Sequence, residues 1–290
     1  MGKSVLLFLL LVAWLSVSSA SVLVVLSRSS ALVCAFWRLV FATLLVAVYV
    51  LVVSGDVKLR FKMSREFLLS AISGVFLAAH FLTWMESLFY IPVSLSTTIV
   101  VTYPLLAMLY EAILGISKPT KEEIVGAVIA FSGVVIAVRP YLADKAFYGS
   151  LLALLGALTG AAYFTLGRLM RKGGVSLTGY TLVCYGTSSL VLLAYSFISN
   201  QQILPAEQGS WVYLVLLGLI PMLGGHTVIN YLMKYMKSYV ATVIGFAEAP
   251  GATILASLVL SQKIEMYVAV GMIVTLSGAL YTLTSPYPEG

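Results

Sequence analysis

The sequence predicts an all-helical polytopic membrane protein, with ten transmembrane helices arranged as two inverted five-helix repeats. Three observations lead to this fold class: an apolar composition, an internal repeat, and a sorting of basic residues between the two sides of a membrane. Hydrophobic residues make up 61% of the 290 residues and charged residues 10%, and the mean hydropathy is +1.04. Soluble domains are closer to half apolar and a quarter charged, so most of this chain requires a bilayer as its solvent.

The internal repeat is clearest at the two histidines of the chain. His80 and His226 lie 146 residues apart, and each is followed 24 residues later by a proline, Pro104 or Pro250. The same offset pairs several serines and leucines elsewhere in the sequence. Self-similarity at one fixed distance indicates two copies of a single structural unit.

Ten apolar stretches can each cross a hydrocarbon core, which takes about 20 residues of helix. They are continuously apolar rather than alternating, which favours helices over the strands of a barrel. Five stretches per copy divide the chain into a first repeat over 1–144 and a second over 145–290, within one integral membrane domain. The stretches run approximately over 4–26, 31–53, 66–88, 93–115, 121–139, 147–169, 176–198, 210–233, 238–261 and 265–284.

The basic residues give the predicted orientation. With the N-terminus in the cytoplasm, 12 lysines and arginines fall on the cytoplasmic side and 4 on the outer side, as the positive-inside rule requires. Both termini are then cytoplasmic, and the net charge of +6 reflects this sorting rather than a nucleic-acid partner. Because five helices are an odd number, the second copy enters the membrane upside down.

Inverted repeats place a binding site between the copies near the membrane midplane and allow that site to face each side in turn. This architecture predicts a secondary transporter that works by alternating access. Pro104 and Pro250 each remove a backbone donor within an apolar stretch, so we expect the helices to kink or hinge there. Sequence motifs for hydrolases, metalloproteases and nucleotide binding are missing, so we predict no enzyme activity and no cofactor.

Charged side chains deep in a bilayer need a specific reason to be there. Glu248 lies near the centre of the ninth stretch, two residues before Pro250, and could bind a cation, an ammonium group or a transported proton. An equally open interpretation is a structural carboxylate held by a neighbouring hydroxyl group. Arg38 in the second stretch either supports the bundle or pairs with a substrate carboxylate or with Glu248. Glu86 and Glu111 lie nearer helix ends, where we expect contact with water.

The histidines and several further side chains are the other candidates for a substrate-binding cavity. His80 has Trp84 one helical turn later, and His226 has Asn230 at the same spacing, so each histidine shares a helix face with a stacking or hydrogen-bonding partner. Bonding across helices is the alternative role for either histidine. The remaining candidates for the cavity wall are Trp14, Tyr103 and Tyr163.

The two cysteines, Cys34 and Cys184, fall inside predicted helices. Neither has the spacing of a metal ligand, and the two histidines lack further partners for a metal site. We therefore expect buried thiols and no bound metal.

Three features along the chain are similar to one known family: the stretch from Tyr90 to Pro104, the segment Glu248-Ala-Pro250, and Arg38 in the second helix. Together with two copies of five helices over about 4–284, they resemble the drug/metabolite transporter superfamily, in particular its ten-helix EamA-type members. The resemblance implies a central cavity lined mainly by helices one, three, four, six, eight and nine. It also implies export or exchange of small metabolites, commonly amino acids or related compounds.

The chain departs from that family at two positions. Gly115 and Ser261 are not followed by the glutamate that often ends these segments in the family. Those positions are near the membrane surface, so the departure bears on the subfamily rather than on the cavity.

The function expected from the sequence is secondary transport of a small amphipathic metabolite, such as an amino acid, across the plasma membrane of a prokaryote. The partners are then the solute and the membrane lipid, with a coupling proton and passive exchange as alternatives for the driving force. Exchange of phosphorylated or nucleotide-linked solutes is a second hypothesis, although it would favour several cations in the cavity, and Arg38 is the one placed deeply. A non-transporting membrane scaffold is the alternative from a different class.

Overall fold

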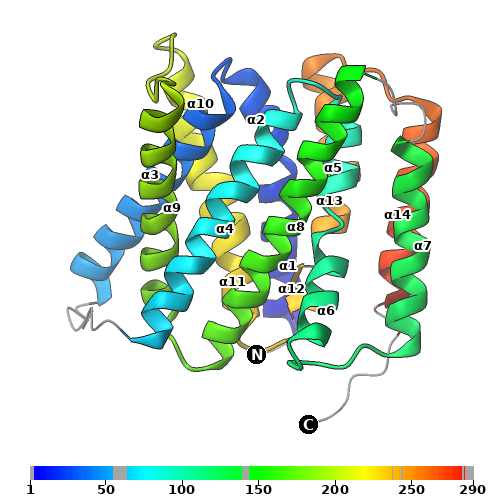
Figure 1. Cartoon of the computed structure of the whole chain (residues 1–290), viewed down its shortest axis with the longest axis horizontal. Coiled ribbons are helices and arrows are strands. Elements are labelled where there is room, and N and C mark those ends of the chain that lie inside the picture. Colours follow the sequence, from blue (N-terminus) through cyan, green and yellow to red (C-terminus); the bar gives the residue numbers. More distant parts are fainter. Residues whose placement is uncertain are drawn as a thin grey trace.

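The computed structural model is a bundle of helices whose axes lie roughly along one common axis, with some helices running up and others down (Figure 1). It describes residues 3–54, 64–138, 144–236, 238–242, 244–282 and 284, and these residues contain no strand. The helices of the first half are α1 (Lys3–Ser18), α2 (Ala20–Leu26), α3 (Ala31–Tyr49), the π-helix η1 (Val50–Ser54), α4 (Arg65–Ser87), α5 (Val93–Val100), α6 (Tyr103–Ile113) and α7 (Lys121–Val138). Those of the second half are α8 (Asp144–Lys172), α9 (Leu177–Ser199), α10 (Ser210–Leu217), the π-helix η3 (Gly218–Thr227), α11 (Val228–Leu232), α12 (Ser238–Thr242), α13 (Ile244–Leu260) and α14 (Met266–Thr282).

Seven of the described segments are long and apolar enough to cross a membrane. They are Ser4–Leu26, Ala31–Val52, Arg65–Ser87, Val93–Ile113, Lys145–Lys172, Leu177–Ser199 and Ser210–Leu232. Two shorter apolar helices, Gly245–Leu260 and Met266–Thr282, fall on the ninth and tenth predicted stretches, and α7, with 18 residues, falls on the fifth. The all-helical class is therefore confirmed, whereas ten crossings in two inverted repeats remain a prediction.

Hydroxyl side chains interrupt two helical segments of the first half. Between α1 and α2, Ser19 Oγ donates to Ser16 O at 2.8 Å, and between α5 and α6, Thr102 Oγ1 donates to Ile99 O at 2.8 Å. Such groups compete with the backbone for carbonyl partners and favour bends and helix ends. Pro104 follows directly in the first turn of α6, where a missing N–H leaves no hydrogen bond unmade.

Two prolines of the second half lie inside helical segments. Pro250 lies within α13, and Pro221 lies within the π-helix η3 that joins α10 to α11. Proline removes a backbone donor, and π-helical turns are rare wide turns that are often found at functional sites. Because η3 extends to Thr227, this wide segment carries His226 in its last turn.

Helices α3 and α9 begin in the same way, 146 residues apart. Ser30 caps α3 by accepting a hydrogen bond from Val33 N at 3.3 Å, and Ser176 caps α9 by accepting one from Gly179 N at 3.0 Å. In Figure 1, α3 runs toward the end of the bundle that carries the N-terminus, whereas α9 runs away from it. The two corresponding helices therefore have the same local start and opposite directions.

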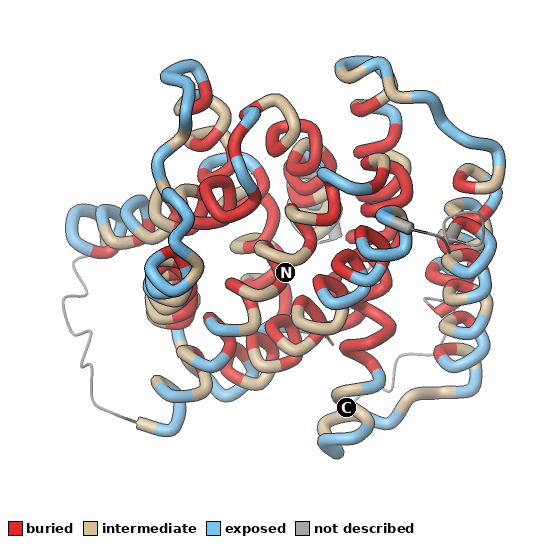
Figure 2. The backbone as a smooth tube through the Cα atoms, turned by 45° about the horizontal axis from the view of Figure 1, so that its top comes forward, coloured by how far each residue is buried: buried red, intermediate tan, exposed pale blue. Residues whose placement is uncertain are grey.

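Helices α4 and α8 pack closely against each other at the centre of the bundle, where buried residues concentrate (Figure 2). A Cβ atom placed on Gly156 would lie 3.0 Å from Cβ of Trp84, and one placed on Gly160 would lie 2.7 Å from Nδ1 of His80. Both glycines of α8 thus leave room for the aromatic side chains of α4. A side chain at either position would displace α4 and the rings that it carries.

Candidate functional site

A small hollow at the centre of the bundle is lined by residues from both halves of the chain. Its lining consists of Val17, Ala20, Arg38, His80, Trp84, Val100, Tyr103, His226 and Glu248. The cavity volume is about 10 Å³, roughly the space that one water molecule occupies by this measure. The side chains therefore nearly fill the hollow, and a larger ligand can bind there only after they move.

The two histidines, predicted from the repeat, meet in this hollow with ring centroids 6.1 Å apart. Nδ1 of His80 donates to Gly156 O at 2.7 Å, since a carbonyl oxygen can only accept. The hydrogen on Nδ1 leaves Nε2 of a neutral ring as an acceptor. Trp84, one turn later on α4, lies nearly parallel to His80 with centroids 6.1 Å apart, and its Nε1 is buried without a hydrogen-bond partner among the described residues.

His226 presents a second unsatisfied group to the centre. Its ring stacks on Phe164 with centroids 5.5 Å apart and an interplanar angle of 13°. Its Nδ1 is buried and has no hydrogen-bond partner in the described part of the chain. His226 and His80 thus come from opposite halves with different surroundings, so the lining is asymmetric.

Arg38 is the cation of the hollow, and it is 1% exposed. Its guanidinium carbon lies 4.0 Å from the centroid of the Phe81 ring, a cation–π arrangement. Among the described residues, Nε and Nη1 of Arg38 have no hydrogen-bond partner, and no ion pair joins Arg38 to Glu248. A buried guanidinium without hydrogen bonds is costly, and such a group is available to an incoming anion.

Glu248 is the carboxylate of the hollow and lies on α13, two residues before Pro250. It is 6% exposed. Tyr103, from the first turn of α6, completes this side of the lining and stacks on Phe164 with centroids 5.0 Å apart. The hollow therefore combines one buried cation, one buried carboxylate and several aromatic faces.

Three predicted cavity residues lie outside this lining. Trp14 Nε1 donates to Ala247 O at 2.7 Å and so ties α1 to α13. Asn230 Nδ2 donates to Tyr163 OH at 2.5 Å. The Tyr163 ring lies next to the lining, with its centroid 5.9 Å from that of His226. Tyr163 and Asn230 therefore form a layer behind His226, whereas Trp14 belongs to a helix contact.

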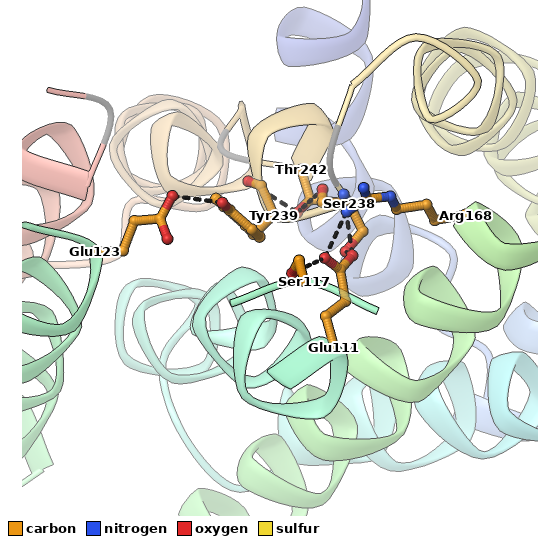
Figure 3. A network of polar contacts seen from close by, with 7 residues as sticks. All are labelled: Glu111, Ser117, Glu123, Arg168, Ser238, Tyr239 and Thr242. Carbon is orange, nitrogen blue, oxygen red and sulfur yellow. Dashed lines mark hydrogen bonds and ion pairs between the residues drawn. The ribbon is translucent and has the colours of Figure 1, made fainter. Parts of the chain in front are cut away.

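The remaining sequence expectations concern the cysteines and two glutamates. Cys34 and Cys184 are free and buried, as predicted. Glu86 is part-buried, but the expectation that Glu111 contacts water is wrong, because Glu111 is 0% exposed. It pairs with Arg168 on α8 at 2.5 Å (Figure 3). The sequence carries no signal for this pair, since its members lie on different helices of different halves.

The described residues contain no group of three or more histidine, cysteine, aspartate or glutamate side chains that could hold a metal ion. What the arrangement offers instead is hydrogen-bond donors from Arg38 and Trp84, with Glu248 as an acceptor and with His226 Nδ1 as a donor or an acceptor according to its tautomer. These groups suit a small organic solute with more than one polar group. A bundle of apolar helices with such a hollow at its centre defines the class of a multi-pass membrane protein.

Comparison with known proteins gives the family within this class. The sequence model of the EamA-like transporter family matches residues 2–139 and again residues 147–284, and the chain belongs to this family. An uncharacterized transporter, YxxF, from Bacillus subtilis (strain 168) is 22% identical over 79% of this chain and 74% of its own length. An uncharacterized transporter in the sor 3'region of Acidianus ambivalens is 28% identical over 57% of this chain and 63% of its own.

The fold also matches a solved structure. A crystal structure described only as that of a protein has a TM-score of 0.75 and 16% sequence identity, with 98% of both chains covered. At this identity the likeness shows the fold alone. The family and the two relatives show that the protein is a transmembrane transporter, which would handle small solutes and lie in lipid.

Proposed function

We propose that this protein is a secondary transporter of small amphipathic metabolites that carry both a carboxylate and an ammonium group, of which amino acids are the simplest class. The observation that carries the proposal is Arg38, a buried guanidinium without hydrogen-bond partners for Nε and Nη1 among the described residues, in the same hollow as Glu248. A carboxylate would form paired hydrogen bonds with the guanidinium. An ammonium group would pair with Glu248, and the aromatic rings of His80, Trp84 and Tyr103 would contact the apolar part.

The transport mechanism that we propose is alternating access between two inverted repeats, over 1–144 and 145–290. It is supported by two matches of one family model, by the equivalent serine caps of α3 and α9, and by the opposite directions of these helices in Figure 1. The near-filled hollow is consistent with a closed state. Pro104, at the break between α5 and α6, and Pro250, inside α13, are the hinges of this mechanism.

The membrane placement that we propose has both termini in the cytoplasm of a prokaryote and the solute moving outward across the plasma membrane. The start of α1 and the end of α14 lie at the same end of the bundle (Figure 1). Arg168, Arg171 and Lys172 lie at the end of α8 on that side, as the positive-inside rule expects for a cytoplasmic face. Cysteines introduced at the exposed residues Lys118 and Gln208 would distinguish the two faces by their accessibility to an impermeant reagent in intact cells.

The test of the substrate class uses the purified protein and one amino-acid scaffold in three forms. A thermal-shift screen of amino acids selects the scaffold, which is then compared with its amide, lacking the carboxylate, and its N-acetyl derivative, lacking the ammonium group. Arg38→Gln is expected to weaken binding of the intact amino acid about tenfold or more, because charge-assisted hydrogen bonds contribute about 1.5–3 kcal/mol. It should leave binding of the amide nearly unchanged.

Glu248→Gln is the reciprocal variant. It should weaken binding of the intact amino acid but not binding of the N-acetyl form. Arg28→Gln, at an exposed arginine, is the matched control. Equal losses for all three forms would contradict the proposed pairing. Uptake into liposomes by the parent protein then separates transport from mere binding. A scaffold should show neither uptake nor stabilisation by the solute.

A coupling proton is the further part of this proposal, with Glu248 as its carrier. Uptake into liposomes is measured over a range of external pH for the parent protein and for Glu248→Gln. The variant should lose the pH dependence of uptake. If uptake and its pH dependence stay as in the parent, Glu248 is not the proton carrier.

A further inference from the structure

A second set of buried polar groups lies at the end of the bundle that carries the N-terminus (Figures 1 and 3). The carboxylate of Glu111, near the end of α6, is its centre. Glu111 Oε2 accepts from Arg168 Nη1 at 2.5 Å and from Ser117 Oγ at 2.8 Å. Glu111 Oε1 accepts from Ser238 N at 3.3 Å and also from Ser238 Oγ. We call Glu111, Ser117, Arg168 and Ser238 the polar clasp.

The polar clasp joins the two halves of the chain. Glu111 and Ser117 belong to the first half, whereas Arg168 on α8 and Ser238 at the start of α12 belong to the second. Next to it, Tyr239 OH donates to Glu123 Oε1 at 2.5 Å, so a second carboxylate of the first half also holds α12 (Figure 3). The ion pair is shielded from water, since Glu111 is 0% and Arg168 6% exposed.

The opposite end of the bundle has no equivalent pair at the corresponding positions. With the 146-residue offset of the repeat, Glu111 corresponds to Ser257 and Arg168 to Val22. The other ion pair of the described residues, between Arg28 and Glu207, does lie at that end, but its atoms are 4.0 Å apart and its side chains are 76% and 60% exposed. Exposed pairs of this kind contribute little. The strong ionic connection between the halves is therefore one-sided.

We propose that the polar clasp is the gate of the end that carries the N-terminus, and that it biases the protein toward the state closed at this end. The inference rests on the proposed alternating-access function, of which it names the control of one side. Opening this end separates α6 from α8 and α12, so the ion pair must break and its charges must be hydrated. The other end opens without breaking a buried ion pair of the described residues, so the two openings differ in free energy.

Two alanines provide matched reporters for the two ends. On α6, Ala107 lies four residues from both Tyr103, which lines the hollow, and Glu111, so it stands on the helix face between hollow and clasp. On α13, Ala252 lies four residues beyond Glu248, toward the opposite end. Both alanines are 0% exposed. A cysteine at either position reports when its own end opens.

The experiment measures the rate at which a membrane-impermeant maleimide labels Ala107→Cys or Ala252→Cys. The protein is reconstituted in nanodiscs, where both faces are accessible, and its native Cys34 and Cys184 are replaced by alanine. Glu111→Gln leaves the Arg168 charge buried without its partner. The state that is open at this end is then favoured, because opening hydrates the Arg168 charge. Labelling at position 107 should rise about tenfold or more, while labelling at position 252 stays the same or falls.

Two further variants make the outcome decisive. Ser238→Ala removes one hydroxyl donor and keeps the ion pair, so it should raise labelling at position 107 by a smaller factor, and it tests the gate even if Glu111→Gln does not fold. Glu86→Gln is the same substitution near the end of α4, at the end of the bundle opposite the polar clasp, and it should change neither labelling rate. Unchanged labelling at position 107, or an equal rise at both positions, would overturn the gate. Neither readout involves a solute, so its failure would leave the proposed substrate class intact, and a failed binding test would leave this result intact.

Discussion

His80 and His226 lie 146 residues apart in the sequence, and their rings meet at a centroid distance of 6.1 Å in the middle of the bundle. One of them is held by Gly156 O, whereas Nδ1 of the other has no partner among the described residues. Two positions related by the 146-residue offset therefore lie in different chemical environments.

The orientation of His80 depends on the small residues of α8. A Cβ atom at position 160 would lie 2.7 Å from His80 Nδ1, so Gly160→Ala is expected to turn the ring and to weaken solute binding about tenfold. Overpacking of this kind costs about 1–3 kcal/mol, which should also lower the unfolding temperature. The control is Gly186→Ala, where the added Cβ would meet only Thr43, at 3.8 Å. Thermal unfolding and solute titration of both variants are the measurements, and equal effects would count against this contact.

Two tryptophans on the inner side of the bundle are expected to respond differently to the same substitution. Trp14 donates to Ala247 O at 2.7 Å, so Trp14→Phe should cost about 1 kcal/mol of stability and leave solute affinity nearly unchanged. Trp84 lines the hollow, and its Nε1 has no partner among the described residues. Trp84→Phe should therefore lower solute affinity, and any loss of stability should come from the smaller buried ring rather than from a lost hydrogen bond. The reverse pattern in unfolding and binding assays would contradict the positions of the two rings.

Two buried arginines provide a comparison between a paired and an unpaired charge. Arg168→Met leaves the Glu111 carboxylate buried without its cation and should destabilise the protein by about 3–5 kcal/mol. Arg38→Met removes a guanidinium that makes no hydrogen bond through Nε or Nη1 to the described residues. We expect it to leave the unfolding temperature unchanged or higher and to abolish solute uptake. A loss of stability as large as that of Arg168→Met would show that Arg38 is mainly structural.

The equivalent caps of α3 and α9 predict equal effects of equal changes. Ser30→Ala and Ser176→Ala each remove a side-chain acceptor for one backbone N–H, and each should cost about 1 kcal/mol. The two losses of stability should add in the double variant, because the effects of substitutions at distant sites are additive. Ser132→Ala, at an exposed helical serine, is the control. Clearly different losses would weaken the equivalence of the two halves.

Much of the fold and part of the site followed from the sequence. Composition predicted the helical membrane class, and the shared spacing of His80 and His226 predicted a relationship that the structure turns into a contact. Trp84, Tyr103 and Glu248, which the sequence proposes as substrate-binding residues, also line the hollow in the structure. Periodicity works for such residues because a helix position fixes which face a side chain occupies.

Other features depend on tertiary contacts that a single sequence does not encode locally. Glu111 was placed near water because it lies close to a helix end, yet Arg168 and Ser238 from the other half enclose it. Trp14 was grouped with the cavity wall, although its indole reaches a backbone carbonyl of α13 instead. The π-helix η3 was not predicted either, because Pro221 and the three glycines of this segment are compatible with several local geometries.

The small volume of the central hollow has a consequence for the energy supply of the cell. A continuous file of water molecules across a membrane conducts protons unless an electrostatic barrier interrupts it. A cavity of about 10 Å³ holds about one water molecule and cannot hold such a file. The same side chains that would recognise a solute thus also interrupt a water file through this hollow while no solute is bound.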